Sequence, residues 1–434
     1  MFVSPVPLAA TVAALRENRL DLFAYINETC DRIEEVEPHI SALLPEPGRR
    51  ERLLDEARVL RERFPDPLER PPLYGVLCGV KDIFLADGFP THAGSLLPAA
   101  LFEGPEAESV SRLRAAGALV LGKTVTTEFA YFEPGPTRNP HNPAHTPGGS
   151  SSGSAAAVAA GFCSLALGTQ TIGSTIRPAS FCGIVGFKPS YGRIPIHGVI
   201  PCSVSVDTVG FFTPDVAGIA LAAPVLCDGW QAIQPAAETL PVLGLPDGPY
   251  LAQASPQGLA AFERQVTALD MAGYTVRRVQ ALADIEAINR RHQRMVFAEM
   301  AQAHRVWFAR YESLYRERTA AAIREGQTVG DDELVACQAS RERLRGELET
   351  LMEQYGVDMW ICPAAPGTAP EGITTTGNAI MNLPWTHAGM PALSLPAGRA
   401  ENGLPLGLQC VGRFMRDEYV VVYAVAIAEA MLVQ

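Results

Sequence analysis

The sequence lacks an excess of positive charge and has no apolar run long enough to cross a membrane. Its 434 residues include 35 Lys and Arg against 47 Asp and Glu, which gives a formal net charge of −12. We therefore expect no basic surface for nucleic acid or anionic lipid. Apolar runs such as 155–160 fall far short of a membrane span. The N-terminal stretch has no basic region before an apolar one, unlike a secretory signal.

Patterns for disulfides and metals are also scarce. The nine cysteines are an odd number, and most lie in apolar stretches, which is typical of reduced thiols that pack as small hydrophobic side chains. No C-x-x-C pair is present, and no glycine-rich phosphate loop follows an expected strand. We expect no metal, no cofactor and a cytoplasmic address. The expected partner is a small-molecule substrate, with a homodimer favoured.

Apolar periodicity predicts an α/β layered domain with a largely buried sheet. The first 65 residues have the apolar spacing of helices, and from residue 74 short apolar runs alternate with helical stretches. The expected strands are 74–84, 118–123, 164–171, 242–245, 275–279, 359–363, 391–396 and 406–411. The expected helices are 106–116, 152–161, 258–271, 288–310, 331–355 and 418–431.

Most of the chemical information lies between residues 148 and 189. There GGSSSGSAAAVAAG places three serines after a glycine pair, and a later apolar strand ends in a second Gly-Ser at Ser174. A flexible Ser/Gly turn, or a helix N-cap by Ser152 or Ser154, explains the first segment by itself. Ser174 differs, because a tight turn at the end of a buried strand presents its hydroxyl beside free backbone N–H groups. A hydroxyl in that setting is a candidate nucleophile with an oxyanion hole.

A nucleophilic serine needs a base, and a lysine is a better candidate than any of the eight histidines. His141 and His145 lie in a turn-rich segment that favours structural roles. Lys81 lies in the apolar run GVLCGVKDIF, where it either pairs with Asp82, extends to solvent, or is buried and neutral. Lowering its pKa from about 10.4 to the ~7–8 that suits a base needs about 4 kcal/mol, which burial and hydroxyl partners can supply.

Three ordered segments resemble the amidase signature family. They are GVKD at 79–82, TPGGSSSGSAAAVAAG at 146–161 and GSTIRPASFCGIVGFKPSYGRI at 173–194, and similarity extends over nearly the whole chain. The resemblance implies a single amidase signature domain over residues 1–434, with a mixed, twisted central β-sheet covered by helices on both faces. Residues 1–65 would pack on it as a helical segment. The implied activity is hydrolysis of a carboxylic amide C–N bond through an acyl-enzyme.

The resemblance also implies a role for each residue of the motifs. Ser174 would be the nucleophile, Ser150 would relay its proton across an unusual cis peptide bond, and Lys81 would be the final base. Ser151 would hydrogen-bond within this network. The oxyanion hole would be formed by the backbone N–H groups of Thr171, Ile172, Gly173 and Ser174.

The chain departs from the family pattern beside the nucleophile. The family usually has T-D-T-G-G-S, whereas this chain has T-Q-T-I-G-S, so that Gln170 and Ile172 replace Asp and Gly. The usual Arg after the nucleophile is replaced by Ile176, with Arg177 next to it. We expect the oxyanion hole to survive, because Ile172 contributes only its N–H. The expected substrate contacts are Tyr131, Phe132, Arg177 and Trp385.

The sequence leaves four functions open. The first is a stand-alone amidase for a small to medium, neutral or aromatic amide, or a hydrolase of urea or carbamate derivatives that uses the same oxyanion hole. The second is the glutamine amidase subunit of a tRNA-dependent amidotransferase, in which Arg341 would bind a carboxylate. The third is an inactive scaffold, and the fourth is a thiol hydrolase using Lys123, Glu128 and Cys182. Ala379 stands where the second function needs an acid, and the complete relay argues against the third. The sequence therefore favours the amidase.

Overall fold

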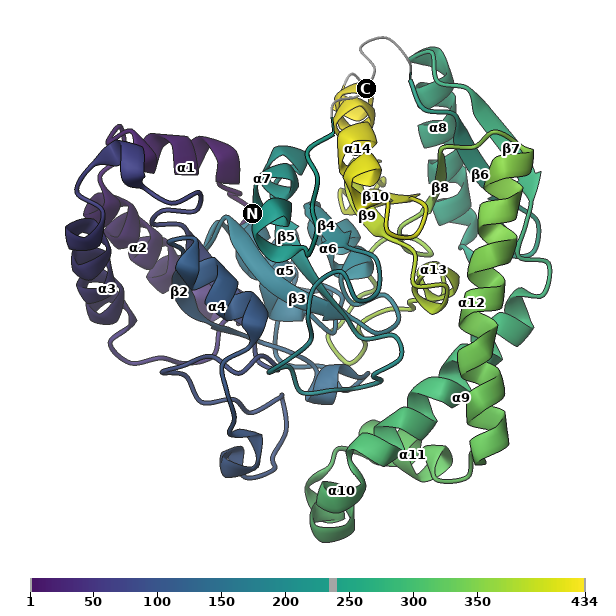
Figure 1. Ribbon diagram of the computed structural model, residues 1–434, viewed down its shortest axis with the longest axis horizontal. Coiled ribbons are helices and arrows are strands. Elements are labelled where there is room, and N and C mark those ends of the chain that lie inside the picture. The colour runs from purple at the N-terminus through teal and green to yellow at the C-terminus, as the bar shows by residue number, and fades with distance from the viewer. Residues whose placement is uncertain (1, 234–239, 433–434) are drawn as a thin grey trace.

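The computed structural model describes residues 2–233 and 240–432. At its centre is a 10-stranded sheet in the order β2-β1-β3-β5-β4-β9-β10-β8-β6-β7. Figure 1 shows the end of the sheet at β2 on the left and the end at β7 on the right. The strands are β1 Leu77–Lys81, β2 Leu119–Thr124, β3 Leu165–Gln170, β4 Val185–Lys188, β5 Thr208–Thr213, β6 Leu243–Asp247, β7 Val276–Gln280, β8 Met359–Pro363, β9 Ala392–Arg399 and β10 Pro405–Val411.

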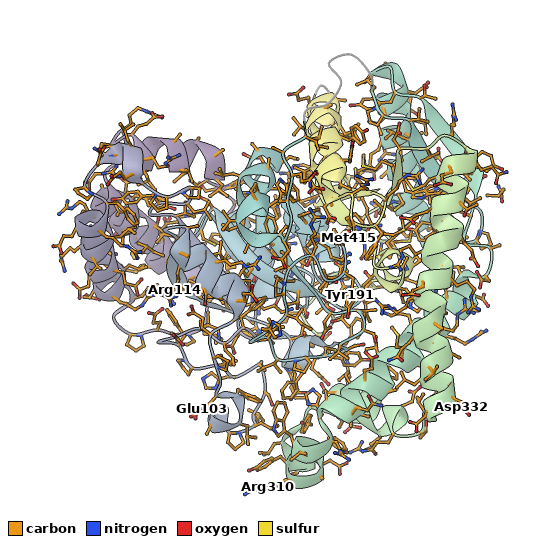
Figure 2. All side chains as sticks on the ribbon, viewed as in Figure 1. Glu103, Arg114, Tyr191, Arg310, Asp332 and Met415 are labelled. Atoms are coloured by element: carbon orange, nitrogen blue, oxygen red, sulfur yellow. The ribbon has the colours of Figure 1, made fainter. Side chains whose placement is uncertain are left out.

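The helices surround this sheet, and none in the described ranges combines the length and apolar character needed to cross a membrane. They are α1 Leu8–Arg16, α2 Leu22–Ile40, α3 Arg49–Arg63, α4 Glu108–Ala115, α5 Ser152–Ala160, α6 Ile176–Cys182, α7 Val216–Leu226, α8 Pro256–Met271, α9 Ile285–Ala303, α10 Arg305–Tyr311, α11 Glu317–Gly326, α12 Asp331–Gln354, α13 Leu383–His387 and α14 Asp417–Leu432. Figure 2 labels Arg310 at the outer tip of α10 and Asp332 at the start of α12, where the helices α9–α12 project from the sheet.

The strand pairing makes the sheet mixed. β1 pairs in parallel with β2 and β3, and β6 pairs in parallel with β7 and β8. Between these two ends, β5, β4, β9 and β10 form antiparallel pairs. Sheets that contain parallel strands are usually covered on both faces, and their strands are then apolar throughout. Accordingly, β1 to β5 and β8 are buried along their whole length.

Helices cover both faces of the sheet, as predicted. Successive residues of a strand point to opposite faces, and along β2 Leu119 and Leu121 join one hydrophobic cluster whereas Val120 joins another. The first cluster contains residues of α2, α3 and α5, and the second contains residues of α4, α7 and α14. The prediction of a mixed sheet with helices on both faces is therefore confirmed.

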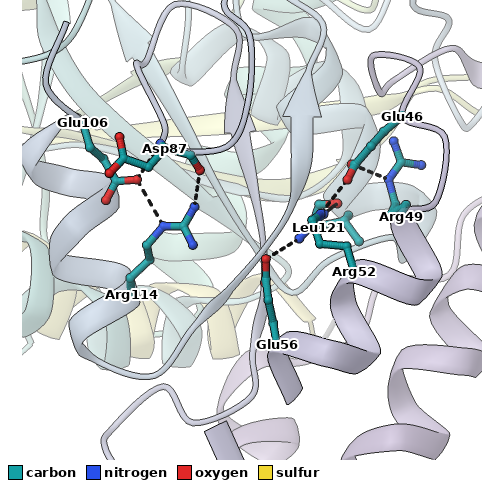
Figure 3. A network of polar contacts seen from close by, with 8 residues as sticks. All are labelled: Glu46, Arg49, Arg52, Glu56, Asp87, Glu106, Arg114 and Leu121. Carbon is teal, nitrogen blue, oxygen red and sulfur yellow. Dashed lines mark hydrogen bonds and ion pairs between the residues drawn. The ribbon is translucent and has the colours of Figure 1, made fainter. Parts of the chain in front are cut away.

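A polar network connects α3 to the edge strand β2 (Figure 3). Arg52 donates a hydrogen bond to the carbonyl of Leu121 at 3.2 Å, and it pairs with Glu46 at 2.6 Å and Glu56 at 3.0 Å. Edge strands expose unpaired backbone groups, and this arginine satisfies one of them. The N-terminal helices thus contact the sheet in two ways. Apolar residues of α2 and α3 pack in the cluster described above, and charged side chains form this partly exposed ionic network.

Two strands, one helix break and four helices, α6, α7, α11 and α13, were not predicted from the sequence. β4 and β5 were not expected, because both are short central strands without the alternation of polar and apolar residues that marks a half-exposed strand. The helix expected at 288–310 is divided into α9 and α10 at His304, although its apolar periodicity continues through the break. His304 is buried and lies 3.0 Å from the hydroxyl of Tyr315, so a contact with a residue outside both helices accompanies the break.

Candidate functional site

The candidate residues meet where the parallel strands β1 and β3 end. Lys81 is the last residue of β1, and Gln170 is the last residue of β3. Neighbouring parallel strands end at the same edge of a sheet, where ligands bind in open α/β folds. Ser150 lies just before α5, which begins at Ser152, and Ser174 lies between β3 and α6.

Lys81 is completely buried, and among the described residues its side chain is hydrogen-bonded only to hydroxyl groups. Its Nζ lies 2.7 Å from Ser150 Oγ and 2.7 Å from Thr169 Oγ1. None of the ion pairs within the described ranges includes this lysine. Burial lowers the Lys81 pKa to about 7, although the charge of Asp207 acts in the opposite direction. A lysine with this pKa is largely neutral at slightly alkaline pH, and its lone pair can then accept a proton.

The two serines line one cavity. The Gly149–Ser150 peptide bond is cis, and Ser150 and Ser174 both face a small space whose volume is about 10 Å³, room for about one water molecule. Ser174 Oγ forms no hydrogen bond with any described residue, including Ser150. Hydrogen bonds of catalytic groups often shorten only when substrate binds. Next to Ser150, Ser151 Oγ contacts the backbone N and O of Thr169 at 3.2 Å each.

The turn before Ser174 presents free donors. The backbone N–H groups of Ile172, Gly173 and Ser174 donate to no acceptor in the part of the chain that the structure describes, although Gly173 and Ser174 are buried. Buried N–H groups without partners are rare. A Cβ on Gly173 would stand 2.3 Å from Asn382 Oδ1, so only glycine fits there. The turn can therefore stabilise negative charge on an oxygen placed in the cavity.

Gln170 supports this turn in place of the usual aspartate. Its Oε1 accepts the N–H groups of Thr175 and Ile176 at 2.9 and 3.0 Å, and its Nε2 donates to Thr386 Oγ1 at 2.9 Å. Ile172 is half-buried, and its carbonyl accepts a hydrogen bond from Thr386 at 2.7 Å. Both departures from the family pattern are thus accommodated by hydrogen bonds to neighbouring elements.

Three of the four expected substrate contacts line the cavity, namely Tyr131, Phe132 and Arg177. Trp385 does not. It is fully buried, and its Nε1 donates to the hydroxyl of Tyr250 at 3.0 Å, so it belongs to the core and its assignment as a substrate contact is wrong. The indole was expected near the substrate because variable loop segments form the pocket walls in this family, but the position of a residue in such a segment does not determine which way its side chain points.

The wall of the cavity holds one uncompensated charge. Arg177 is 1% exposed, and its Nη2 donates to Gly149 O at 2.6 Å and to Thr376 Oγ1 at 3.1 Å. Its Nε and Nη1 are buried without a hydrogen-bond partner, and no carboxylate of the described residues pairs with it. Burial lowers the Arg177 pKa to about 9, so the group stays charged at pH 7. Phe132 lies over the guanidinium at 6.0 Å.

Two site residues were not anticipated from the sequence. Thr169 holds the second hydrogen bond of Lys81, and buried Asp207 accepts hydrogen bonds from Thr171 Oγ1 at 2.6 Å and from the N–H of Cys202 at 2.7 Å. Burial raises the Asp207 pKa to about 6. A polar residue inside an apolar strand was the only signal for Thr169. Asp207 gave no signal as a site residue, because the contact that links it to the turn, through Thr171, joins residues 36 positions apart in the sequence.

Other candidate groups lie apart. Lys123 pairs with Asp82 at 3.0 Å, Glu128 accepts the N–H of Arg316, and the thiol of Cys182 contacts the carbonyl of Pro147, so the residues of a thiol hydrolase have separate partners. Within the described ranges no three His, Cys, Asp or Glu side chains are grouped so that they could hold a metal ion.

The chain is similar to known proteins over most of its length. The Amidase family profile matches residues 24–421. The A-type subunit of glutamyl-tRNA(Gln) amidotransferase from Synechococcus sp. (strain WH7803) is 33% identical over 447 residues, covering 89% of this chain and 89% of that protein. A crystal structure of an amidase has a TM-score of 0.88 at 32% identity, covering 98% of this chain and 99% of that one. A peptide amidase in complex with the competitive inhibitor chymostatin has a TM-score of 0.82 at 27% identity, covering 98% and 97%.

Proposed function

Because the chain belongs to the Amidase family, we propose that it hydrolyses the amide bond of a small substrate with Ser174 as nucleophile. Ser174 Oγ attacks the carbonyl carbon while Ser150 accepts its proton and passes its own proton to Lys81. The oxygen of the tetrahedral intermediate accepts hydrogen bonds from the backbone N–H groups of the turn 171–174. Ser150 then returns a proton to the nitrogen, because an amide anion does not leave. Water repeats these steps on the acyl-enzyme.

The observation that carries this proposal is the neutral environment of Lys81. A neutral amine has two protons and one lone pair, so it can donate to Thr169 Oγ1 while it accepts from Ser150, both at 2.7 Å. A carboxylate beside the lysine would keep it protonated and prevent this transfer. Thr169 therefore orients the lone pair toward Ser150.

Activity of three variants tests the relay. Amine or ammonia release would be measured on amides of acetic, propionic and benzoic acid and on the monoamide of succinic acid. We expect Ser174→Ala and Lys81→Ala to lose turnover while circular dichroism shows an intact fold. Lys188→Ala is the matched control, because Lys188 is equally buried, its pKa is also lowered to about 7, and its amine donates, within the described ranges, only to backbone carbonyls. Turnover by Ser174→Ala would show that another group is the nucleophile.

Arg177 supports a substrate with a negative group. A buried charge without a partner is costly, and here its unpaired Nε and Nη1 belong to a side chain that lines the same cavity as Ser174. Arginine binds carboxylates with two parallel hydrogen bonds. A carboxylate on the substrate would pair with this guanidinium and hold the amide near the nucleophile. The charge therefore favours a short anionic amide over the neutral or aromatic amide expected from the sequence.

The contribution of Arg177 is measured with matched substrates. Wild type should hydrolyse the monoamide of succinic acid with higher kcat/KM than its methyl ester, and Arg177→Gln should lose about two powers of ten on the acid only, the scale of a buried charged hydrogen bond. Arg70→Gln is the control, since Arg70 is also buried, donates to the carbonyl of Leu15 at 2.8 Å and does not line the cavity. Equal losses on both substrates would mean that Arg177 only supports Gly149.

The similarity to an amidotransferase component gives a second candidate. In that function the substrate would be glutamine, and an acid would be expected to hold its amino group. At the position of that acid the chain has Ala379, whose Cβ packs against the turn at Gly173. A purified chain that hydrolyses simple amides by itself supports the stand-alone enzyme, whereas activity on glutamine that appears only with partner proteins supports the amidotransferase.

A further inference from the structure

Side chains from two helices hold the carbonyl groups of the turn that precedes Ser174. His292 Nε2, on α9, lies 3.1 Å from the carbonyl oxygen of Thr171, and Thr386 Oγ1, on α13, lies 2.7 Å from the carbonyl oxygen of Ile172. His292 is 0% exposed and Thr386 is 1% exposed. Neither side chain lines the catalytic cavity, so any effect on the reaction must pass through the backbone of the turn.

A chain of hydrogen bonds fixes the proton on His292. A carbonyl oxygen only accepts, so His292 Nε2 must carry hydrogen. In a neutral ring Nδ1 is then an acceptor, and its neighbour at 3.2 Å is Nδ1 of His387. His387 must donate from that atom, so its Nε2 is an acceptor, and the hydroxyl proton of Ser340 points to this nitrogen at 2.7 Å rather than to the carbonyl of Cys337, which also lies 2.7 Å from the hydroxyl. Burial lowers the pKa of both imidazoles, to about 3 and about 2, which agrees with two neutral rings.

A similar argument orients Thr386. Gln170 Oε1 accepts two backbone N–H groups, so the atom that faces Thr386 is the donor Nε2. The threonine oxygen accepts from it, and its proton is free to point elsewhere. Ile172 O at 2.7 Å is a closer acceptor than Asn382 O at 3.1 Å. Both carbonyl groups of the turn, those of Thr171 and Ile172, therefore accept hydrogen bonds from side chains whose own orientations are fixed.

The position of a carbonyl determines the direction of the next N–H. In a trans peptide the C=O and N–H groups point in opposite directions across one rigid plane. Holding Thr171 O toward α9 turns the N–H of Ile172 away from α9. In the same way, holding Ile172 O toward α13 turns the N–H of Gly173 away from α13. These are N–H groups that find no acceptor in the described part of the chain, in a turn whose residues line the catalytic cavity.

We propose that His292 and Thr386 are positioning residues that aim the N–H groups of Ile172 and Gly173 at the oxygen that becomes negative during the reaction. The inference rests on the proposed amide hydrolysis at Ser174. Preorganised donors accelerate such reactions because they need no reorientation when charge develops. A turn without these two anchors would keep its sequence but would lose the fixed direction of its donors, so transition-state binding would weaken more than substrate binding.

Paired variants separate positioning from packing. His292→Leu removes the donor, and His292→Gln keeps an N–H at similar reach. Thr386→Val removes the hydroxyl, and Thr386→Ser keeps it. Gln265→Leu is the control for loss of a buried hydrogen bond, because Gln265 donates to Ala397 O at 2.8 Å and lies outside the cavity lining. Ser174→Ala is assayed beside them.

Two readouts are measured on each variant that circular dichroism shows to be folded. The first is kcat and KM on the amide that wild type hydrolyses fastest. The second is the rate at which a fluorophosphonate labels Ser174, because its phosphoryl oxygen takes the place of the substrate oxygen. Removing an oxyanion-hole donor typically lowers kcat by 10²–10³-fold, so we expect a tenfold to hundredfold loss, as an order of magnitude, when an anchor is removed.

The expected result is a loss of kcat and of labelling rate in His292→Leu and Thr386→Val, with KM changed by less than about threefold, and recovery in His292→Gln and Thr386→Ser. Gln265→Leu should lose stability but not kcat. Unchanged kcat and labelling in the two apolar variants, or equal loss in Gln265→Leu, would overturn the inference. If Ser174→Ala retains turnover, the proposed function itself is wrong, whatever the anchors do.

Discussion

Replacing Lys81 with methionine should abolish turnover and yet stabilise the protein at neutral pH. Burial lowers the Lys81 pKa from 10.5 to about 7, so at pH 7 and below the folded protein is destabilised by about 5 kcal/mol relative to the unfolded chain. Methionine of similar volume removes that cost. It also leaves the hydroxyls of Ser150 and Thr169 without their partner, at about 1–2 kcal/mol each. The net gain at pH 7 is about 2 kcal/mol.

The sign of this gain depends on pH. Between pH 7 and 10.5 the unfolded chain binds the Lys81 proton and the folded chain does not, so wild-type stability rises with pH in this window. At pH 10 the cost of burying the amine has fallen to about 1 kcal/mol, and Lys81→Met should be less stable than wild type by about 2 kcal/mol.

Urea unfolding at pH 7 and pH 10, monitored by far-UV circular dichroism, measures the difference in unfolding free energy between Lys81→Met and wild type at each pH. Lys123→Met is the matched control. Lys123 is also buried, but it pairs with Asp82 at 3.0 Å, so its removal leaves a buried carboxylate and should destabilise by about 3–5 kcal/mol. If Lys81→Met is as destabilised as Lys123→Met at pH 7, burial does not lower the Lys81 pKa, and the amine cannot act as the base at neutral pH.

Two further predictions concern pH and thiol reactivity. The kcat/KM for any amide substrate should rise with pH through about 7, because only neutral Lys81 accepts a proton; a pH–rate profile that is flat between pH 5.5 and 8.5, as a rough range around that pKa, would exclude this assignment. All nine cysteines are buried, and burial raises the pKa of Cys163 and Cys362 to about 12. A colorimetric disulfide reagent should therefore label almost no thiol in native protein and all nine after unfolding in urea; rapid labelling of the native form would contradict the burial.

The strand and helix alternation was predictable because local patterns determine it. Apolar runs of strand length and helices of 3.6-residue period can be recognised without knowledge of their neighbours, and β8 was predicted with its observed bounds. The two central strands β4 and β5 were not predictable in this way, since full burial removes the alternation that marks a strand. The break at His304 was not predictable either, because the hydrogen bond to Tyr315 that accompanies the break is tertiary.

The candidate site shows the same division. The sequence by itself determined that Lys81, Ser150 and Ser174 belong to one motif set, because catalytic residue types at ordered positions are legible along the chain. Only the tertiary structure decided that Thr169 also hydrogen-bonds to Lys81, that Arg177 pairs with no carboxylate of the described residues, that Trp385 is core, and that α9 and α13 hold the turn. These facts depend on which distant side chains share a small, poorly hydrated space, where each hydrogen bond and each missing partner has a large effect, and no local pattern contains that information.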